Sequence, residues 1–188
     1  MSPSDDQSAF CGRANRVLSE RLEIAPLTRP ETELYLTDVE EFARALRLSE
    51  APREPDPDVR VACDWLIEVG LRFDAASSPY GALWAIAELS TRRMIGRFGF
   101  KGEPIDGEAE ICYGIDPAFR GRGFATEAIR ALVDWGWTRR DLRGLVAETL
   151  KENAASRRVL TKCGFAVVGE ERPDEDALFW RIERPRRS

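Results

Sequence analysis

A loop rich in glycine and arginine stands immediately before a helical pattern, within residues 116–128. Gly121 and Gly123 lack a Cβ, so the backbone there can adopt unusual dihedral angles and lie close to a ligand. A helix that begins beside them leaves several amide groups without partners and directs its positive dipole end at negative charge. Arg120 and Arg122 add cationic donors beside those amides. This combination predicts a binding site for phosphate groups.

Other phosphate-binding loops fit this spacing less well. The ATP-type loop requires Gly-x-x-x-x-Gly-Lys followed by Ser or Thr, and the chain contains no such string. A dinucleotide fingerprint requires a third small residue where Thr126 stands, although Asp141 lies at a tolerable distance for a ribose contact. A strand-to-helix turn with solvated arginines and no ligand is the other interpretation of the loop taken alone.

A second motif lies about thirty residues after the loop, in residues 153–165. It opens with Asn153 and Ser156 and closes with Lys162-x-Gly164-Phe165. The loop pattern Arg120-x-x-Gly123-x-Ala125 resembles the pyrophosphate-binding signature of the GNAT acyltransferases, and this motif resembles the family's second signature. The resemblance covers about residues 84–183 and is closest to the branch that contains aminoglycoside and ribosomal-protein alanine acetyltransferases.

The resemblance implies an acetyl-CoA-dependent N-acetyltransferase. Acetyl-CoA would be a co-substrate, with no metal, and the acceptor would be a primary amine of a small molecule or of a protein N-terminus that attacks the thioester directly. A non-catalytic CoA-binding or CoA-sensing module is the alternative from another class. A dinucleotide-dependent oxidoreductase is a weaker alternative.

The resemblance also implies which residues hold the cofactor. Tyr113 and Ile115 would offer backbone groups to the thioester and the pantetheine arm. Asn153 would hydrogen-bond the pantetheine arm, and Ser156, one helical turn later, would face the same cofactor. The pyrophosphate would be held by the loop residues Arg120, Gly121, Arg122, Gly123, Phe124 and Ala125. Since Asn153 and Ser156 also fit the N-cap and N3 positions of a helix, capping alone is another interpretation of that pair.

Proton transfer needs further groups. Glu110 and Glu148 are candidate general bases, because they lie on the two predicted strands that would flank the cofactor. Either glutamate would equally fit a solvated sheet position or an ion pair. The tyrosine that the family often uses to protonate the leaving thiolate is replaced by Leu160. Ser156 is the first candidate for that role, and Tyr113, which also fits a packed strand aromatic, is the second.

The composition excludes several classes of enzyme. The chain has no histidine, which rules out Ser-His-Asp and Cys-His hydrolases and histidine-ligated metal centres. Its cysteines are far apart and form no Cys-x-x-Cys pair, so neither a zinc site nor a disulfide framework is indicated; they are Cys11, Cys63, Cys112 and Cys163. We expect Cys112 and Cys163 to be core residues.

Charge is unevenly distributed along the chain. The net charge is −5, but residues 117–163 carry ten Lys and Arg against five Asp and Glu, which leaves −10 elsewhere. A polyanionic cofactor over the basic part and a cationic amine approaching the acidic part would fit this field, although most of these charges must be solvated helix faces. The short basic tail is expected to fray and not to bind nucleic acid.

No apolar run reaches membrane-spanning length, and residues 1–20 are too polar for a secretory signal. We therefore expect a cytoplasmic protein that does not associate with membranes. A homodimer is left open, and the candidate interface residues are Trp84, Trp135 and Trp180.

Hydrophobic periodicity and the order of the elements predict one α/β domain with a mixed sheet. The resemblance implies that this sheet is GNAT-like, twisted and mostly antiparallel. The helix after the loop is a crossover, so its two flanking strands are parallel neighbours. The resemblance implies that this central pair splays apart and that about four helices flank the sheet. A flexible segment is expected at 1–20, the domain at 21–183 and a basic tail at 184–188. Strands are expected at 21–27, 82–89, 94–102, 108–115, 144–150, 165–171 and 177–183, and helices at 38–46, 59–73, 125–139 and 153–163. In the first of these helices, Val39, Phe42, Ala45 and Leu46 are expected to face inward.

Overall fold

The computed structural model describes residues 9–10, 13, 15–55, 78–169 and 176–185. Eight strands in this part form one sheet with the spatial order β1-β2-β3-β4-β5-β6-β8-β7. The strands are β1 Val17–Leu18, β2 Leu22–Pro26, β3 Leu83–Glu88, β4 Arg93–Phe100, β5 Glu108–Ile115, β6 Gly144–Leu150, β7 Ala166–Gly169 and β8 Ala177–Glu183. The described α-helices are α1 Arg29–Thr37, α2 Val39–Ala45, α4 Phe124–Thr138 and α5 Ala154–Lys162, and the turns η2 Pro79–Gly81 and η3 Pro117–Phe119 are 3₁₀-helical. The expected helix at 59–73 lies outside the described residues.

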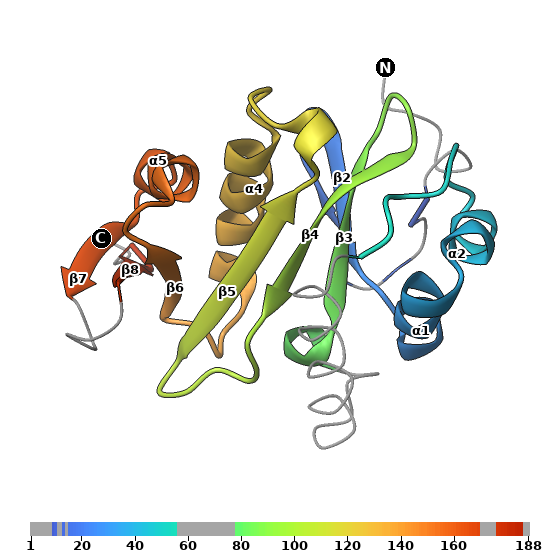
Figure 1. Cartoon of the computed structure of the whole chain (residues 1–188). Coiled ribbons are helices and arrows are strands. Elements are labelled where there is room, and N and C mark those ends of the chain that lie inside the picture. Colours follow the sequence, from blue (N-terminus) through green and yellow to red (C-terminus); the bar gives the residue numbers. More distant parts are fainter. Residues whose placement is uncertain (1–8, 11–12, 14, 56–77, 170–175, 186–188) are drawn as a thin grey trace.

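Strands β5 and β6 are the parallel pair, and the neighbouring strands on both sides are antiparallel. Their pairing runs from Glu108↔Gly144 to Ile111↔Ala147 and ends there, although both strands continue. Figure 1 shows the two arrows diverging beyond their paired part, with α4 behind them. The predicted mixed sheet with a splayed parallel pair is therefore confirmed.

The sheet buries apolar side chains on both faces. On β3, Trp84 and Ile86 join the core beneath α4, whereas Leu83 and Ala85 join the core beneath α1 and α2. Because alternate residues of a strand point to opposite faces, a strand covered on both sides is apolar throughout. Helix α4 presents an apolar stripe to its face; the buried residues are Phe124, Ala128, Ile129, Leu132, Val133 and Gly136.

The first helices begin at caps that the sequence encodes. Thr28 accepts a hydrogen bond from the amide of Glu31, and the Glu31 carboxylate accepts one from the amide of Thr28, which is a capping box. Asp38 accepts from the amide of Glu41 at the start of α2, as predicted from the sequence.

Several expectations were wrong in detail. Ala45 is exposed and Ala43 is buried, because Ala43 shares the inward face of α2 with Phe42 and Leu46. On β6, Glu148 is exposed, since the strand leaves its neighbour β5 after Ala147.

The N-terminal segment also differs from expectation. Within the expected flexible segment, Val17 and Leu18 pair with β2, and Phe10 is fully buried against α1 and α2. Of the proposed interface residues, Trp84 and Trp180 are buried within the protein, so they do not offer a surface to a partner.

Candidate functional site

The glycine-rich loop leads from η3 into α4, just after the carboxyl end of the interior strand β5. Gly121 has φ +76° and Gly123, the N-cap of α4, has φ +84°, values that residues with a side chain rarely adopt. The first backbone hydrogen bond of the helix runs from the amide of Glu127 to the carbonyl of Gly123. Within the described residues, none of the amides from 121 to 126 donates to a backbone carbonyl. Amides without partners at a helix N-terminus suit a bound anion, which is what the sequence predicts for this loop; we call residues 120–126 the amide loop.

The two arginines of the amide loop are held by the protein itself. Arg120 donates from Nε to the carbonyl oxygen of Ile115 at 2.8 Å, which ties the loop to the end of β5. Arg122 lies over the rings of Phe119 and Phe124 at 5.8 and 4.9 Å, and its Nη2 is 3.6 Å from a carboxylate oxygen of Glu88. Both guanidinium groups therefore stand beside the loop in fixed directions.

A brace from the N-terminal strands holds the start of α4. Glu127 accepts hydrogen bonds from the Ser19 hydroxyl and from the backbone amide and Nε of Arg21, each at 2.7 Å. Arg21 also donates to the carbonyl of Arg122 and stacks over the ring of Phe124 at 4.4 Å. Burial alone would raise the pKa of Glu127, but these donors and the charge of Arg21 lower it below its ordinary value. The carboxylate is therefore charged, and it joins the start of α4 to the residues between β1 and β2.

The two candidate bases lie on one face of the sheet, at the point where β5 and β6 separate. Glu110 precedes the last paired residue of β5, and Glu148 follows the last paired residue of β6. The ammonium group of Lys101, just after β4, is 2.5 Å from Glu110 Oε1 and 3.9 Å from Glu148 Oε2. Each of the three side chains is between 31% and 43% exposed, so solvent reaches the cluster. One lysine thus joins the two candidate bases.

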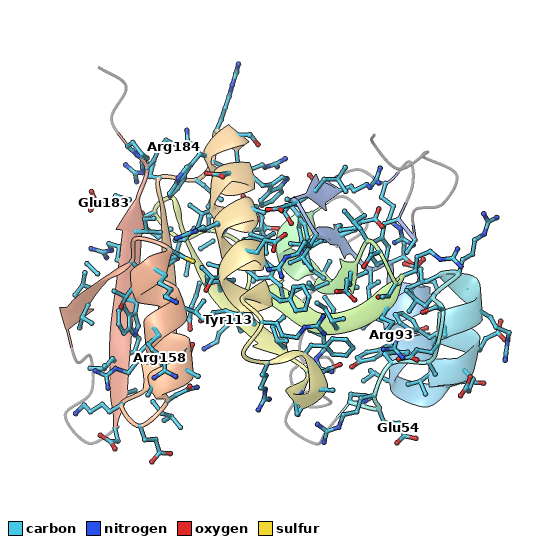
Figure 2. The ribbon with its side chains drawn as sticks, turned by 90° about the horizontal axis from the view of Figure 1, so that it is seen from above. Glu54, Arg93, Tyr113, Arg158, Glu183 and Arg184 are labelled. Atoms are coloured by element: carbon cyan, nitrogen blue, oxygen red, sulfur yellow. The ribbon has the colours of Figure 1, made fainter. Side chains whose placement is uncertain are left out.

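The two candidates for protonating a leaving thiolate meet on the opposite face of the sheet. The hydroxyls of Tyr113 and Ser156 are 2.8 Å apart, and the Tyr113 hydroxyl is 3.4 Å from the Ser156 carbonyl oxygen. Figure 2, seen from above, places Tyr113 between α4 and α5. Burial raises the pKa of Tyr113 to about 12, and the hydrogen bond with Ser156 only partly opposes this. The phenol is therefore protonated at neutral pH.

The alternation of β5 separates these two groups. Tyr113 and Ile111 face the core beneath α4, so Glu110 and Cys112 must face the other side of the sheet. The diverging strands therefore have carboxylates on the face that α1 and α2 partly cover, and hydroxyls on the face of α4 and α5. A ligand held between the strands would meet both sets of groups.

Other predicted site residues keep structural partners. Asn153 Oδ1 accepts from the amide of Ser156 at 3.0 Å, so Asn153 is an N-cap, and its side-chain NH₂ is the part left to donate to a ligand. Leu160 is fully buried in the core. The side chains of Ile115 and Phe124 are also buried, so only their backbone groups are available to a ligand.

Sequence reasoning missed three charged residues of this region, which are Lys101, Arg21 and Arg97. Lys101 follows a strand by one residue and carries no local motif. Arg97 is paired with the buried Asp116 at 3.4 Å and donates to the Tyr35 hydroxyl of α1, so it ties η3 to the first helix. Only the order of strands in the sheet brings these residues to the site.

Among the described residues, no group of three or more His, Cys, Asp or Glu side chains could hold a metal ion. In the same ranges, every helix is too short or too polar to cross a membrane.

Of the described cysteines, Cys112 and Cys163 are free thiols; Cys163 is buried, as expected, and Cys112 is half-buried. Burial raises the pKa of the Cys163 thiol to about 11.

Comparisons with known proteins agree with this geometry. The Acetyltransferase (GNAT) domain family matches residues 21–166. The uncharacterized N-acetyltransferase YoaA of Bacillus subtilis (strain 168) is 36% identical over 90 residues, which are 47% of this chain and 51% of that protein. The chain spans about half the length of the curated relatives it matches.

Solved structures share the fold over most of the chain. RimL, a ribosomal L7/L12 alpha-N-protein acetyltransferase in complex with coenzyme A, superposes with a TM-score of 0.64 at 20% identity, over 90% of this chain and 98% of that one. Spermidine N-acetyltransferase from Vibrio cholerae, in complex with CoA and spermine, gives a TM-score of 0.61 at 18% identity, over 88% and 96%. At these identities the likeness concerns the fold.

Proposed function

The chain belongs to the GNAT acetyltransferase family, and from that premise we propose that it transfers the acetyl group of acetyl-CoA to a primary amine by direct attack. The observation that carries the proposal is the end of the β5–β6 ladder at Ile111↔Ala147, on the same strand that leads into the amide loop. A loop suited to phosphate groups thus stands beside an opening between two strands. This arrangement suits a long cofactor with a pyrophosphate at one end and a thioester at the other.

The amide loop would hold the pyrophosphate. Its unpaired amides and the N-terminus of α4 supply donors that need no rearrangement, and Arg120 and Arg122 stand beside them. The backbone of Tyr113 and Ile115 would bind the thioester and the pantetheine arm, and Asn153 would donate to that arm from its side-chain amide. The family likeness and the coenzyme A bound in the RimL structure support this assignment.

The amine would approach from the face of Glu110 and Glu148. An amine attacks only when neutral, and a carboxylate in hydrogen-bond reach, or one water away, can accept its proton. The two glutamates also attract a cationic acceptor before it loses that proton. Holding the amine and the thioester together between the strands accounts for most of the rate enhancement.

The departing thiolate would be met on the other face by the hydroxyls of Tyr113 and Ser156. Because the phenol keeps its proton at neutral pH, Tyr113 can donate to developing negative charge on sulfur, and Ser156 orients it. This pair would supply the hydroxyl group that the family often takes from a tyrosine at the position of Leu160.

Two acceptor classes are supported by the relatives. RimL acts on the N-terminus of a ribosomal protein, and the Vibrio cholerae enzyme acts on spermidine. Both acceptors present a primary amine, and the carboxylates of Glu110 and Glu148 suit a cationic one. We therefore propose a small molecule or a protein N-terminus as the acceptor.

A non-catalytic CoA-binding module remains a second candidate. The observation that favours it is Leu160, which is fully buried where the family often places its tyrosine acid. Tight binding of CoA together with slow acetylation of every amine offered would support this candidate over the enzyme.

Calorimetric titration with acetyl-CoA tests the proposal. Arg120→Glu reverses a charge beside the amide loop, and Gly123→Trp blocks the loop. Arg140→Glu makes the same charge reversal at an exposed residue after α4 and serves as the matched control. We expect the wild type and the Arg140→Glu variant to bind acetyl-CoA and both loop variants to lose binding. That result justifies a screen for thiol release with a panel of amines. A folded wild type that does not bind acetyl-CoA would overturn the proposal.

A further inference from the structure

Lys101 places a primary amine at the point where β5 and β6 separate. Its Nζ lies 2.5 Å from a carboxylate oxygen of Glu110, which stands one residue before the end of the ladder. It is 3.9 Å from Glu148, which stands one residue past that end on the other strand. The ammonium group therefore bridges the two strands at the base of the opening, on the face from which an acceptor would approach.

The choice of lysine at this position is unusual for this chain. Of its 28 lysine and arginine residues, only Lys101, Lys151 and Lys162 are lysines. Arginine would pair with a carboxylate through two parallel hydrogen bonds and stay charged at every working pH. Lysine offers a single amine that becomes a nucleophile once it loses a proton. An ion pair alone would thus be served better by the residue that the chain uses almost everywhere else.

The carboxylates beside Lys101 hold its proton, and one of them is placed to accept it. Burial alone would lower the pKa of Lys101, but the hydrogen bond and charge of Glu110, with the charge of Glu148, raise it above its ordinary value. The amine therefore rests in its charged form, and the nearest group that can accept its proton is the same Glu110 proposed as the general base.

We propose that Lys101 is an internal acceptor and that the protein acetylates it from acetyl-CoA. The inference rests on the proposed function, which supplies the acetyl donor. Glu110 takes one proton from the ammonium group, and the neutral Nζ attacks the carbonyl carbon of the thioester. A C–N bond forms and the C–S bond breaks, the second proton from nitrogen neutralises the thiolate, and the products are Nε-acetyl-Lys101, CoA with a free thiol, and one proton released through Glu110 to water.

The modification would change the site that it occupies. An acetylated lysine carries no charge, so Glu110 and Glu148 would lose the cation that they share. Both carboxylates would then be available to a cationic acceptor from solution.

The test uses acetyl-CoA with a ¹³C-labelled acetyl group and the full chain without an added amine. Acetylation blocks tryptic cleavage after Lys101, so residues 98–120 are released as one labelled peptide. Lys151 is the internal control, because it also pairs with a carboxylate, at 3.6 Å from Asp176, and its side chain is 36% exposed against 43% for Lys101. A CoA analogue that lacks the sulfur competes for the cofactor site and separates bound from solution acetylation.

We expect Lys101 to be labelled at least tenfold faster than Lys151. The CoA analogue and the Glu110→Gln substitution should each suppress the labelling of Lys101. The Lys151→Arg substitution should leave the rate of Lys101 labelling unchanged. Equal rates at the two lysines, or labelling that the analogue does not slow, would show solution chemistry and overturn the inference. Calorimetry on the same sample distinguishes the two failures. If acetyl-CoA binds and external amines are acetylated while Lys101 stays unlabelled, only this inference fails, whereas absence of binding removes the proposed function as well.

Discussion

The hydroxyl groups of Tyr113 and Ser156 lie 2.8 Å apart, although 43 residues separate them in the chain. Tyr113 comes from β5 and Ser156 from the first turn of α5, so the contact joins β5 to the helix that follows β6. We propose that a tyrosine held in this way takes the role of the acid that a tyrosine at the position of Leu160 would supply.

We predict that Tyr113→Phe lowers kcat by about 100-fold, the lower end of what one general acid contributes, while the affinity for acetyl-CoA changes little. Ser156→Ala should lower kcat less, because it removes the partner that orients the phenol. The double variant should lose no more than Tyr113→Phe alone, since the two groups act as a unit. Steady-state kinetics with calorimetric affinities would measure all three.

The matched control for this pair is Thr161→Val. Thr161 is on the same helix, and its hydroxyl bonds to the carbonyl of Arg157, away from Tyr113. Its loss should leave kcat unchanged. Full activity in Tyr113→Phe would remove the phenol from the mechanism.

Glu110→Gln should reduce kcat by about 100-fold, because the amide cannot accept the proton of the attacking amine. Glu108→Gln is the control on the same strand, since Glu108 pairs with Arg181 at 2.9 Å and has no assigned role in the chemistry. If Glu148 is the base instead, Glu148→Gln will show the larger loss. Equal, small effects in all three variants would mean that water alone accepts the proton.

Elements set by local sequence were predictable, and contacts set by strand order were not. Residues 108–115 and 144–150 were predicted with the bounds that β5 and β6 have, because periodicity and the turn pair Asp116-Pro117 are local signals. Gly164 has a positive φ of 88° just beyond α5, at the position where glycine commonly ends a helix. In contrast, Arg21 meets Glu127 across 106 residues, and no pattern within either segment indicates the other.

The candidate site divides in the same way. The amide loop was predictable because its glycines and the helix that follows are adjacent in sequence. The bridge made by Lys101 was not, because Lys101 meets Glu110 and Glu148 only when β4, β5 and β6 lie side by side. Tyr113 and Ser156 were each proposed from the sequence, but as alternatives, and the fold joins them.

The backbone of the amide loop should tolerate no side chain without a loss of affinity. Gly121→Ala adds a Cβ that meets no atom within 4 Å, so its cost is the left-handed conformation alone, about 1 kcal/mol. Relief of that strain would rotate the amides away from the phosphates, and we expect the affinity for acetyl-CoA to fall at least tenfold. Gly102→Ala is the control, because Gly102 also has a positive φ and open space but lies outside the loop. It should reduce the free energy of unfolding by a similar amount and leave the affinity intact.

The brace between Glu127 and the N-terminal strands should make stability depend on pH. The pKa of Glu127 is lowered below its ordinary value of 4.5 in the folded protein, so the stabilisation is fully present above that value and is lost as the pH falls through the folded pKa. Glu127→Gln should therefore cost about 1–2 kcal/mol of unfolding free energy at about pH 7 and less at about pH 3. Urea unfolding at both pH values measures the difference. Glu33→Gln is the control, since Glu33 and its partner Arg29 are each at least half exposed and such surface pairs contribute little. If the loss in Glu127→Gln were the same at both pH values, the effect would come from altered packing and not from the charged carboxylate.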